Sequence, residues 1–327
     1  MKRAKILGTG SYLPTRIMSN ADLSRIVDTN DEWIKTRTGM SERHIAHDDE
    51  TTSDMGYAAA LEAISNAGLK SDDIDGIIVA TVTPDMNFPS NACILQDRLE
   101  IPSCLAFDFN AACSGFVYGL HIANSLIATG EANNILVIGS EKLTAITDYT
   151  DRNTCVLFGD GAGAVVLGGS ETTQGIRGTC VGADGSKGEL LKKHAGQTRM
   201  PVNKMGINDY KMQYIYMDGK AIFKSAVNRM TGSLATAVEK AGLKLSDLNM
   251  VIPHQANLRI IESVREFAKL REDQVFINIH KTGNTSSASI PIALDEAMRS
   301  GRLKTGNILG LTAFGGGLTF GAAVIEI

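Results

Sequence analysis

Two segments of this chain, separated by about half its length, repeat one pattern. "AGLKSDDIDGIIVATVTPD" begins at Ala67, and "AGLKLSDLNMVIPHQAN" begins at Ala241. A looser match joins "ATGEANNILVIGSE", around Gly130, to "RSGRLKTGNILGLTAFGGG", around Gly301. The repeated unit predicts a helix that ends at a glycine turn, followed by a short polar loop and an apolar strand.

A repeat at this spacing indicates two similar halves rather than a solenoid of many short units. We place the first half at residues 1–172 and the second at residues 173–327. Chance similarity is the alternative, because a helix that ends in Ala-Gly-Leu before a strand is a common connection. In either case, 327 residues are enough to bury a sizeable core.

The most apolar runs of the sequence favour buried sheets. They are "DGIIVATV", "NNILVIGSE", "TCVLFGDGAGAVVLGG" and "GNILGLTAFGGG". Their lack of polar alternation is typical of strands that helices cover on both faces. Helical segments lie between these runs, and four glycines are placed to end helices: Gly68, Gly130, Gly242 and Gly301. The sequence therefore predicts an α/β protein.

Composition and charge argue against several classes of function. The formal net charge of −4 gives no sign of a nucleic-acid surface. The first residues show no signal peptide and no run reaches membrane-spanning length, so we expect a cytoplasmic protein without membrane contact. The glycines of "FGDGAGAVVLGG" lack the dinucleotide-binding spacing and precede a strand rather than a helix, which argues against a nicotinamide enzyme.

The five cysteines do not form a recognisable framework. Their number is odd, no two have C-x-x-C spacing, and no histidine lies at metal-ligand spacing beside them. Disulfide frameworks and zinc sites are therefore not expected. The ordinary interpretation of each cysteine is a small buried apolar side chain.

Cys113 is the exception, because of where it lies. In "FDFNAACSGFVYGL" it stands where a predicted strand ends and a predicted helix, apolar nearly all round, begins. A helix start offers unpaired N–H groups and the positive end of the dipole, which favour a thiolate, so we expect a lowered pKa. The same N–H groups can hold an oxyanion. Cys113 is thus a candidate nucleophile, with the buried cysteine as the alternative.

Two residues of the second half are candidate partners. His254 follows an apolar strand and precedes a helix, so it lies at the carboxyl edge of a sheet, where α/β proteins place their sites. The offset of the internal repeat carries Asn110 onto Asn284, so the loop of Asn284 is a candidate duplicate of the cysteine loop. With two-fold pseudo-symmetry, both helix starts would face a shared pocket. His280 is an alternative to His254, since it lies four residues before Asn284.

Four motifs, in this order and spacing, resemble the β-ketoacyl-acyl-carrier-protein synthase III family: "DFNAACSGF", "PHQANLRI", "GNTSSAS" and "AFGGGLTFGAA". The resemblance extends from "GTGSYLPTR" through "NDEWIKTRTGMSERHIA" to the last residues, so it covers the whole chain. It implies a thiolase-like α/β fold, in which two pseudo-symmetric αβα halves form a five-layered αβαβα core, and a homodimer. It also implies a catalytic triad of Cys113, His254 and Asn284.

The resemblance implies a decarboxylative Claisen condensation. Cys113 would take an acyl group, most simply acetyl, from acyl-coenzyme A (acyl-CoA), with the N–H groups of Cys113 and Gly316 as the oxyanion hole. His254 and Asn284 would stabilise the enolate that forms as malonyl-acyl-carrier-protein loses carbon dioxide. The product would be a 3-ketoacyl-acyl-carrier-protein. The resemblance implies no metal and no redox cofactor. The coenzyme A thioester and the phosphopantetheine-bearing carrier protein are substrates rather than cofactors.

The resemblance also implies binding residues for coenzyme A. Trp33 and Arg152 match an adenine sandwich, in which an aromatic face and a guanidinium stack on the base. Arg37 and Asn257 match further coenzyme A contacts. The alternative for the single tryptophan is a core or surface anchor.

Three further residues are implied to contact other proteins. Phe88 matches a residue that the family inserts from the partner subunit to close the acyl pocket. Arg259 and Lys224, with Arg265 and Lys269 near them, could form a basic patch for the acidic carrier protein. The alternative for each of these cations is a solvated helix face.

Two other classes of function stay open. A starter condensing enzyme of polyketide or secondary-metabolite synthesis would share the fold and the pair Cys113 and His254, with a different acyl donor or acceptor. A non-enzymatic or hydrolytic protein would leave the cysteine inert or pass its acyl group to water. Primer length and branching, regulation and the pathway are not determined by the sequence.

Overall fold

The computed structural model describes residues 2–172 and 174–327, which form two large sheets and two small ones. The five-stranded sheet has, in spatial order, β1 (Arg3–Tyr12), β7 (Gly161–Ser170), β6 (Asn134–Glu141), β4 (Gly76–Ala80) and β5 (Leu105–Phe109). The four-stranded sheet has, in spatial order, β8 (Gly175–Ala183), β13 (Thr319–Glu326), β12 (Ile308–Gly315) and β11 (Met250–Pro253). The small sheets pair β2 (Arg16–Ser19) with β3 (Glu42–Ile45), and β9 (Leu191–Lys193) with β10 (Ile215–Met217).

Ten α-helices lie in the described residues. They are α1 (Asn20–Leu23), α2 (Asp31–Thr38), α3 (Thr52–Asn66), α4 (Asn91–Arg98), α5 (Gly115–Thr129), α6 (Arg152–Cys155), α7 (Gly219–Lys240), α8 (Leu258–Phe267), α9 (Ile279–Thr282) and α10 (Ser289–Arg299). The predicted boundary between residues 172 and 173 falls at Thr173, which lies outside the described residues.

The two large sheets are built in the same way. In the first, β1, β7 and β6 are antiparallel neighbours, and β6, β4 and β5 are parallel. In the second, β8, β13 and β12 are antiparallel neighbours, and β12 and β11 are parallel. The place of β5 is taken by a single parallel bridge from Val251 to Val275. The internal repeat predicted from the sequence therefore corresponds to two sheets of matching topology.

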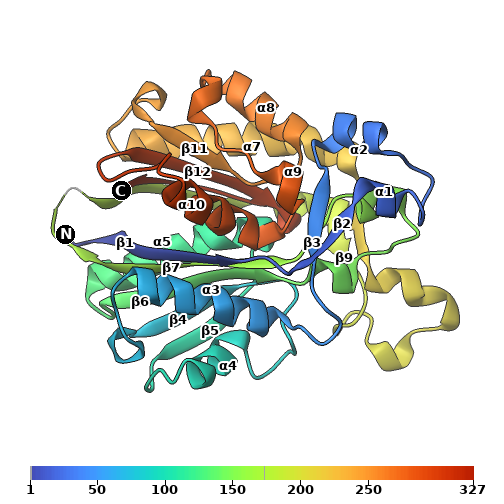
Figure 1. The fold of residues 1–327 in the computed structure, drawn as a ribbon, viewed down its shortest axis with the longest axis horizontal. Helices are drawn as coiled ribbons and strands as arrows, with labels where there is room; N and C mark the ends of the chain where they lie inside the picture. Colours follow the sequence, from blue (N-terminus) through green and yellow to red (C-terminus); the bar gives the residue numbers. More distant parts are fainter. Residues whose placement is uncertain (1, 173) are drawn as a thin grey trace.

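Helices α5 and α10 lie between the two large sheets (Figure 1). Phe116 and Leu120 of α5, with Ile290 and Leu294 of α10, belong to one buried cluster that includes strand residues of both sheets. Helices α3 and α4 cover the other face of the first sheet, and α7 and α8 cover the second (Figure 1). The layers thus run helix, sheet, helix, sheet, helix, and the predicted αβαβα core with a buried α5 is confirmed.

Helix ends follow the predicted signals. The four glycines placed after helices all have left-handed backbone angles, with φ of 67°, 82°, 70° and 70° at Gly68, Gly130, Gly242 and Gly301. Because only glycine adopts this region without strain, each ends its helix where the repeat places it. Asn257 caps α8, where its Oδ1 accepts the N–H of Arg259 at 2.9 Å.

The parallel strands direct their carboxyl ends toward one side of the molecule. β4, β5 and β6 are mutually parallel, as are β11 and β12, so the loops that follow them gather at the right-hand side of Figure 1. This is the side where α/β sheets place their sites. No helix in the described residues is long and apolar enough to span a membrane, and no cluster of metal-ligating side chains occurs in these ranges.

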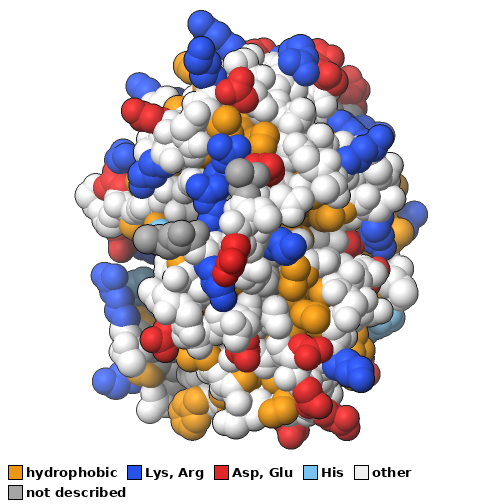
Figure 2. Space-filling model, turned by 90° about the vertical axis from the view of Figure 1, so that its left-hand side faces the viewer, with side chains coloured by type: hydrophobic (Ala, Val, Ile, Leu, Met, Phe, Trp, Pro, Cys, Tyr) orange, Lys and Arg blue, Asp and Glu red, His pale blue; other side chains and the backbone are white. Residues whose placement is uncertain are grey.

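The opposite side carries both chain ends. Figure 2 shows this face with Lys and Arg side chains interspersed among Asp and Glu, and with small apolar patches between them. Charges of both signs therefore lie side by side among the described residues of this face.

Candidate active site

Cys113 lies in a tight turn between a strand and a buried helix. The chain leaves β5, forms a 3₁₀ turn over Ala112–Ser114 and enters α5 at Gly115. Ala112 has a positive φ of 47°, and its N–H donates to Asn110 Oδ1 at 3.0 Å. The predicted strand-to-helix transition is confirmed, with the difference that α5 begins two residues after the cysteine.

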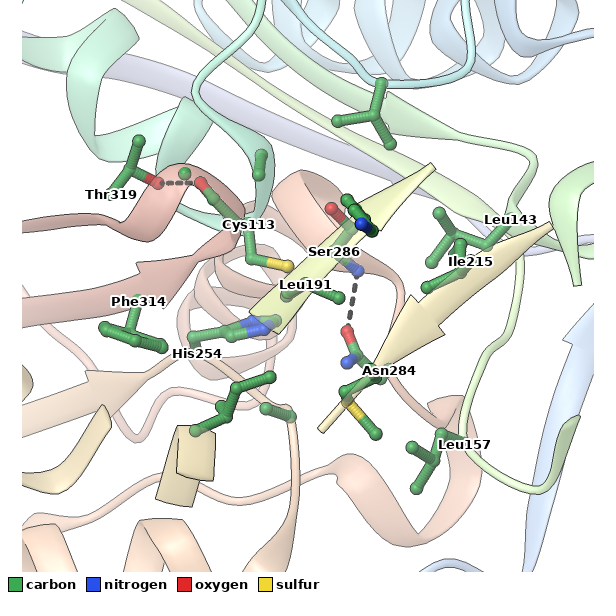
Figure 3. Close-up of a pocket in the computed structure, with 18 of the residues that line it drawn as sticks. Cys113, Leu143, Leu157, Leu191, Ile215, His254, Asn284, Ser286, Phe314 and Thr319 are labelled. Atoms are coloured by element: carbon green, nitrogen blue, oxygen red, sulfur yellow. Dashed lines mark hydrogen bonds between the residues drawn. The ribbon is translucent and has the colours of Figure 1, made fainter. Parts of the chain in front are cut away.

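The second half supplies the wall behind this turn. A Cβ on Gly315, at the end of β12, would lie 2.5 Å from the Cys113 nitrogen, so only glycine fits this position. Thr319 Oγ1 donates to the Ala111 carbonyl at 2.7 Å (Figure 3). Backbone from both halves therefore determines where the sulfur lies.

The expected lowering of the cysteine pKa is not found. Burial raises the pKa of the Cys113 thiol to about 12, and the nearby Glu141 carboxylate acts in the same direction. A hydrogen bond with the Ser286 hydroxyl opposes this rise. Desolvation shifts a buried group by up to about 3–5 units, whereas a helix terminus contributes about 0.3–1 kcal/mol, less than one unit. The prediction from helix position alone was wrong because burial outweighs the dipole, and the resting side chain is a thiol.

His254 begins the loop after β11 and is 2% exposed. Its backbone N–H donates to the Thr312 carbonyl at 2.8 Å, and its ring Nδ1 lies 2.6 Å from Ser289 Oγ. Burial lowers the pKa of the imidazole to about 3, so the ring is neutral at physiological pH. A neutral ring carries a single N–H, which makes its tautomer decisive for what it can do.

Asn284 has one end of its amide already engaged. Its Oδ1 accepts the N–H of Ser286 at 2.9 Å, so its Nδ2 group is the end directed at His254 (Figure 3). The backbone N–H of Asn284 donates to the Leu157 carbonyl, and the Asn284 carbonyl accepts the N–H of Gly159. These two hydrogen bonds hold Asn284 against the first half. His280, the alternative considered for His254, is an exposed residue of α9 outside the cavity lining, and this alternative was wrong.

Cys113, His254 and Asn284 line one cavity of about 550 Å³, together with Gly316. Figure 3 shows the three side chains converging from separate elements. Most other lining residues are apolar, among them Leu143, Leu157, Leu191, Ile215 and Phe314. The cavity therefore combines a thiol, a neutral imidazole and a free amide with apolar walls that can enclose an alkyl chain.

Comparison with known proteins identifies the family. Residues 107–185 match the model of 3-oxoacyl-[acyl-carrier-protein] synthase III, and residues 238–327 match the model of its C-terminal part. A β-ketoacyl-[acyl-carrier-protein] synthase III of Caldanaerobacter subterraneus is 52% identical, and the match covers 99% of this chain and 97% of that protein. One of Xanthomonas campestris is 51% identical, with 99% and 98% covered. This chain belongs to the β-ketoacyl-acyl-carrier-protein synthase III family.

Solved structures of the family have the same fold. The synthase III of Aquifex aeolicus superposes with a TM-score of 0.93 at 48% identity, covering 99% of this chain and all of that one. A priming β-ketosynthase of the R1128 polyketide pathway superposes with a TM-score of 0.92 at 36% identity, with 99% and 96% covered. The thiolase-like fold predicted from the motifs is confirmed.

In this member of the synthase III family, three of the four predicted coenzyme A residues, Trp33, Arg37 and Arg152, form a cluster outside the cavity lining. The guanidinium carbon of Arg152 lies 4.9 Å from the centroid of the Trp33 ring, and that of Arg37 lies 5.9 Å from it. A planar base stacked between Trp33 and Arg152 needs about 7 Å, two contacts of roughly 3.5 Å each. These two side chains must therefore separate to admit adenine. Asn257 does line the cavity, and its Nδ2 donates to the Arg37 carbonyl at 3.1 Å.

The predicted protein-contact residues lie on the surface. Phe88 is 85% exposed and does not line the cavity of its own chain. Arg259 and Lys224 are exposed near the cavity, with the Arg259 guanidinium carbon 6.0 Å from the Phe223 ring that lines it. In the described ranges neither cation is in an ion pair, whereas Arg265 pairs with Glu262 at 2.6 Å.

Three polar residues of this synthase III site received no role from the sequence. Glu141, at the end of β6, is fully buried and accepts hydrogen bonds from Thr83 Oγ1 at 2.7 Å and Ser287 Oγ at 2.9 Å. Ser286 and Ser289 lie within "GNTSSAS", where only the asparagine was assigned. The sequence did offer a signal for Glu141, because it is a carboxylic acid at the end of an apolar strand. A buried acid at such a position needs hydrogen-bond partners.

Proposed function

We propose that this protein condenses a short acyl-CoA primer, most simply acetyl-CoA, with malonyl-acyl-carrier-protein. The products are a 3-ketoacyl-acyl-carrier-protein, coenzyme A and carbon dioxide, at the first step of fatty-acid synthesis. The observation that carries the proposal is the convergence of Cys113, His254 and Asn284 on one apolar-walled cavity, in a member of the synthase III family.

The first half-reaction is acyl transfer. The Cys113 sulfur loses its proton and attacks the thioester carbonyl, and the N–H groups of Cys113 and Gly316 donate hydrogen bonds to the oxyanion. The carbon–sulfur bond to coenzyme A then breaks, and the proton lost by the thiol ends on the coenzyme A sulfur. The apolar wall beside the sulfur encloses the alkyl part of the acyl-enzyme.

The second half-reaction is decarboxylation and condensation. His254 Nε2–H and Asn284 Nδ2–H donate to the thioester carbonyl of the malonyl group, and this stabilises the enolate that forms as carbon dioxide leaves. Neutral donors suit this task, because a carboxylate would oppose the developing negative charge. The carbanion attacks the acyl-enzyme, the bond to Cys113 breaks, and the sulfur takes up a proton from solvent.

The binding assignments belong to the same proposal. Trp33, Arg152, Arg37 and Asn257 hold coenzyme A, Phe88 closes the acyl pocket of a partner subunit in a homodimer, and Arg259 and Lys224 receive the carrier protein. The exposed state of Phe88 supports its role, because a large apolar side chain at a surface favours a protein contact. No step requires a metal or redox cofactor. The cytoplasmic location stays a prediction.

The polyketide starter function is the weaker alternative. The priming β-ketosynthase of the R1128 pathway is 36% identical to this chain, whereas the three bacterial synthases III named above are 48–52% identical. The higher identity favours the fatty-acid substrate pair.

Labelling with radioactive acetyl-CoA tests the proposal. The wild-type protein should retain one acetyl group per chain and release it as 3-ketoacyl-acyl-carrier-protein when malonyl-acyl-carrier-protein is added. Cys113→Ser should retain none, because a hydroxyl is a far weaker nucleophile than a thiol. Cys93→Ser is the matched control, since Cys93 is exposed and outside the cavity lining, and it should label fully. Absence of label in the wild type, or loss of the label to water, would refute the mechanism.

A further inference from the structure

Ser289, the first residue of α10, holds the ring of His254 from the side opposite the cavity. Its Oγ lies 2.6 Å from His254 Nδ1, and both residues are 2% exposed. The backbone N–H of Gln255 points at the same Oγ, at 3.3 Å. The hydroxyl therefore has two neighbours, one of which can only donate.

These contacts determine the direction of the hydrogen bond. Ser289 Oγ accepts from the Gln255 N–H, and its single proton needs an acceptor. Among the described residues, the His254 Nδ1 is the remaining partner of this hydroxyl. If Nδ1 carried the ring proton instead, a buried hydroxyl proton would be left without an acceptor, which is costly. The chain of donors is thus Gln255 N–H to Ser289 Oγ–H to His254 Nδ1.

The ring proton then lies on Nε2, the nitrogen beside the cavity. We propose that Ser289 is a positioning residue that holds neutral His254 in its Nε2–H tautomer, so that this nitrogen is a hydrogen-bond donor to the malonyl thioester and not a base. The proposal rests on the proposed function and specifies it further. A hydroxyl that does not touch the substrate thus determines whether His254 can donate to it in the second half-reaction.

The internal repeat supports this assignment independently. Its offset carries Gly115 onto Ser289 and Ala80 onto His254, so the same two positions meet in both halves. In the first half the contact is so close that a Cβ on Gly115 would lie 2.8 Å from the Ala80 Cβ. That pair is small and apolar, and it only packs. The second half has a hydroxyl and an imidazole at the same contact. Because the first half packs here with apolar residues, packing alone does not explain the polar pair.

Ser289→Ala tests the proposal in two ways. Nitrogen-15 spectra of histidine-labelled protein, with the His254 signal assigned by its loss in His254→Gln, should show Nε2–H in the wild type and a mixture of tautomers in the variant. Decarboxylation of malonyl-acyl-carrier-protein should fall about tenfold, because loss of the bond to Ser289 releases the tautomer and weakens one donor to the enolate. Acylation of Cys113 by acetyl-CoA should change less than about twofold, since its oxyanion is held by backbone N–H groups.

Ser300→Ala is the control, because Ser300 follows the last residue of the same helix and its Oγ donates to the Ala297 carbonyl. It should leave both half-reactions and the His254 signal unchanged. An intact acylation rate shows that Ser289→Ala is folded at the site. A His254 signal that stays Nε2–H in Ser289→Ala, or equal losses in the two half-reactions, would overturn the proposal. Wild-type protein that does not decarboxylate the malonyl substrate would refute the proposed function, and the tautomer signal would still test the role of Ser289.

Discussion

At the scale of single residues, two turns of related sequence have different chemistry. Asn110 accepts the N–H of Ala112, and Asn284, its counterpart in the repeat, accepts the N–H of Ser286. Ala112 and Ser286 also share a left-handed backbone, with φ of 47° and 50°. The backbone is thus duplicated, while the next residue is Cys113 in one copy and serine in the other. One backbone geometry thus holds the proposed nucleophile in the first half and the proposed amide donor in the second.

The pKa of Cys113 leads to a prediction at this scale. A thiol with a pKa raised to about 12 is almost fully protonated at neutral pH, so its thiolate fraction grows about tenfold with each pH unit. Alkylation of Cys113 by iodoacetamide in the free enzyme should therefore keep rising from pH 7 to pH 9 without a plateau. Cys113→Ser gives the background from the other cysteines. A plateau below pH 8 would mean that the helix terminus does lower the pKa of this thiol.

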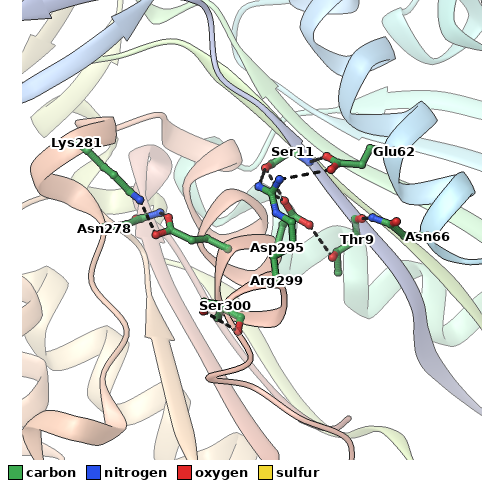
Figure 4. Close-up of polar contacts among 11 residues, drawn as sticks. Thr9, Ser11, Glu62, Asn66, Asn278, Lys281, Asp295, Arg299 and Ser300 are labelled. Carbon is green, nitrogen blue, oxygen red and sulfur yellow. Dashed lines mark hydrogen bonds and ion pairs between the residues drawn. The ribbon is translucent and has the colours of Figure 1, made fainter.

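At the scale of elements, polar contacts join α10 of the second half to the first half. Figure 4 shows Asp295 and Arg299 of α10 beside Ser11 of β1 and Glu62 of α3. Asp295 is fully buried and accepts from Thr9 Oγ1 at 2.8 Å and Ser11 Oγ at 2.6 Å. Because Ser289 begins the same helix, these bonds also fix the helix that positions His254.

Asp295→Ala should lower the free energy of unfolding by about 3 kcal/mol, because it leaves the buried Thr9 hydroxyl and the partly buried Ser11 hydroxyl without this acceptor and Arg299 without its close partner. Urea denaturation measures this change. Asp273→Ala is the control, since Asp273 forms an exposed pair with Arg271, and surface pairs are worth about 0–1 kcal/mol. Similar losses in the two variants would show that the contacts in Figure 4 do not brace the two halves.

At the scale of the whole molecule, the two sides differ in what they present. Loops that follow the parallel strands line the cavity, and Arg259 and Lys224 lie near it. The opposite side carries both chain ends (Figure 1) and has mixed charge (Figure 2). An acidic carrier protein is attracted to unpaired cations that surround the entrance to a site. The overall charge of −4 does not reveal this local arrangement.

Arg259→Glu should raise the KM for malonyl-acyl-carrier-protein about five- to tenfold and spare the KM for acetyl-CoA, because charge reversal at a rim weakens encounter with an acidic partner. Steady-state kinetics at low salt measures both constants. Lys304→Glu makes the same change of charge at an exposed turn near the chain end and should alter neither. An unchanged KM in Arg259→Glu, or an equal rise in both variants, would remove Arg259 from the docking surface.

Local patterns were enough to predict much of this protein. The repeat predicted two matching sheets, the apolar runs predicted strands covered on both faces, and four glycines predicted helix ends, because each of these depends on near neighbours in the chain. Cys113 and His254 became candidates because strand-to-helix loops at a sheet edge are visible in the sequence. Asn284 was proposed from the offset of the internal repeat, and the triad of the three residues from the family resemblance.

What only the tertiary structure decided concerns burial and contacts between the halves. The sequence placed Cys113 at a helix start, but burial in the folded chain raises its pKa, since desolvation depends on the atoms packed around a group. Ser289 and Glu141 were missed for the same reason, because their partners lie 35 and 146 residues away in the chain. The sequence determines the residue types at the site, whereas the protonation of Cys113 and the tautomer of His254 depend on the atoms that surround them in the folded chain.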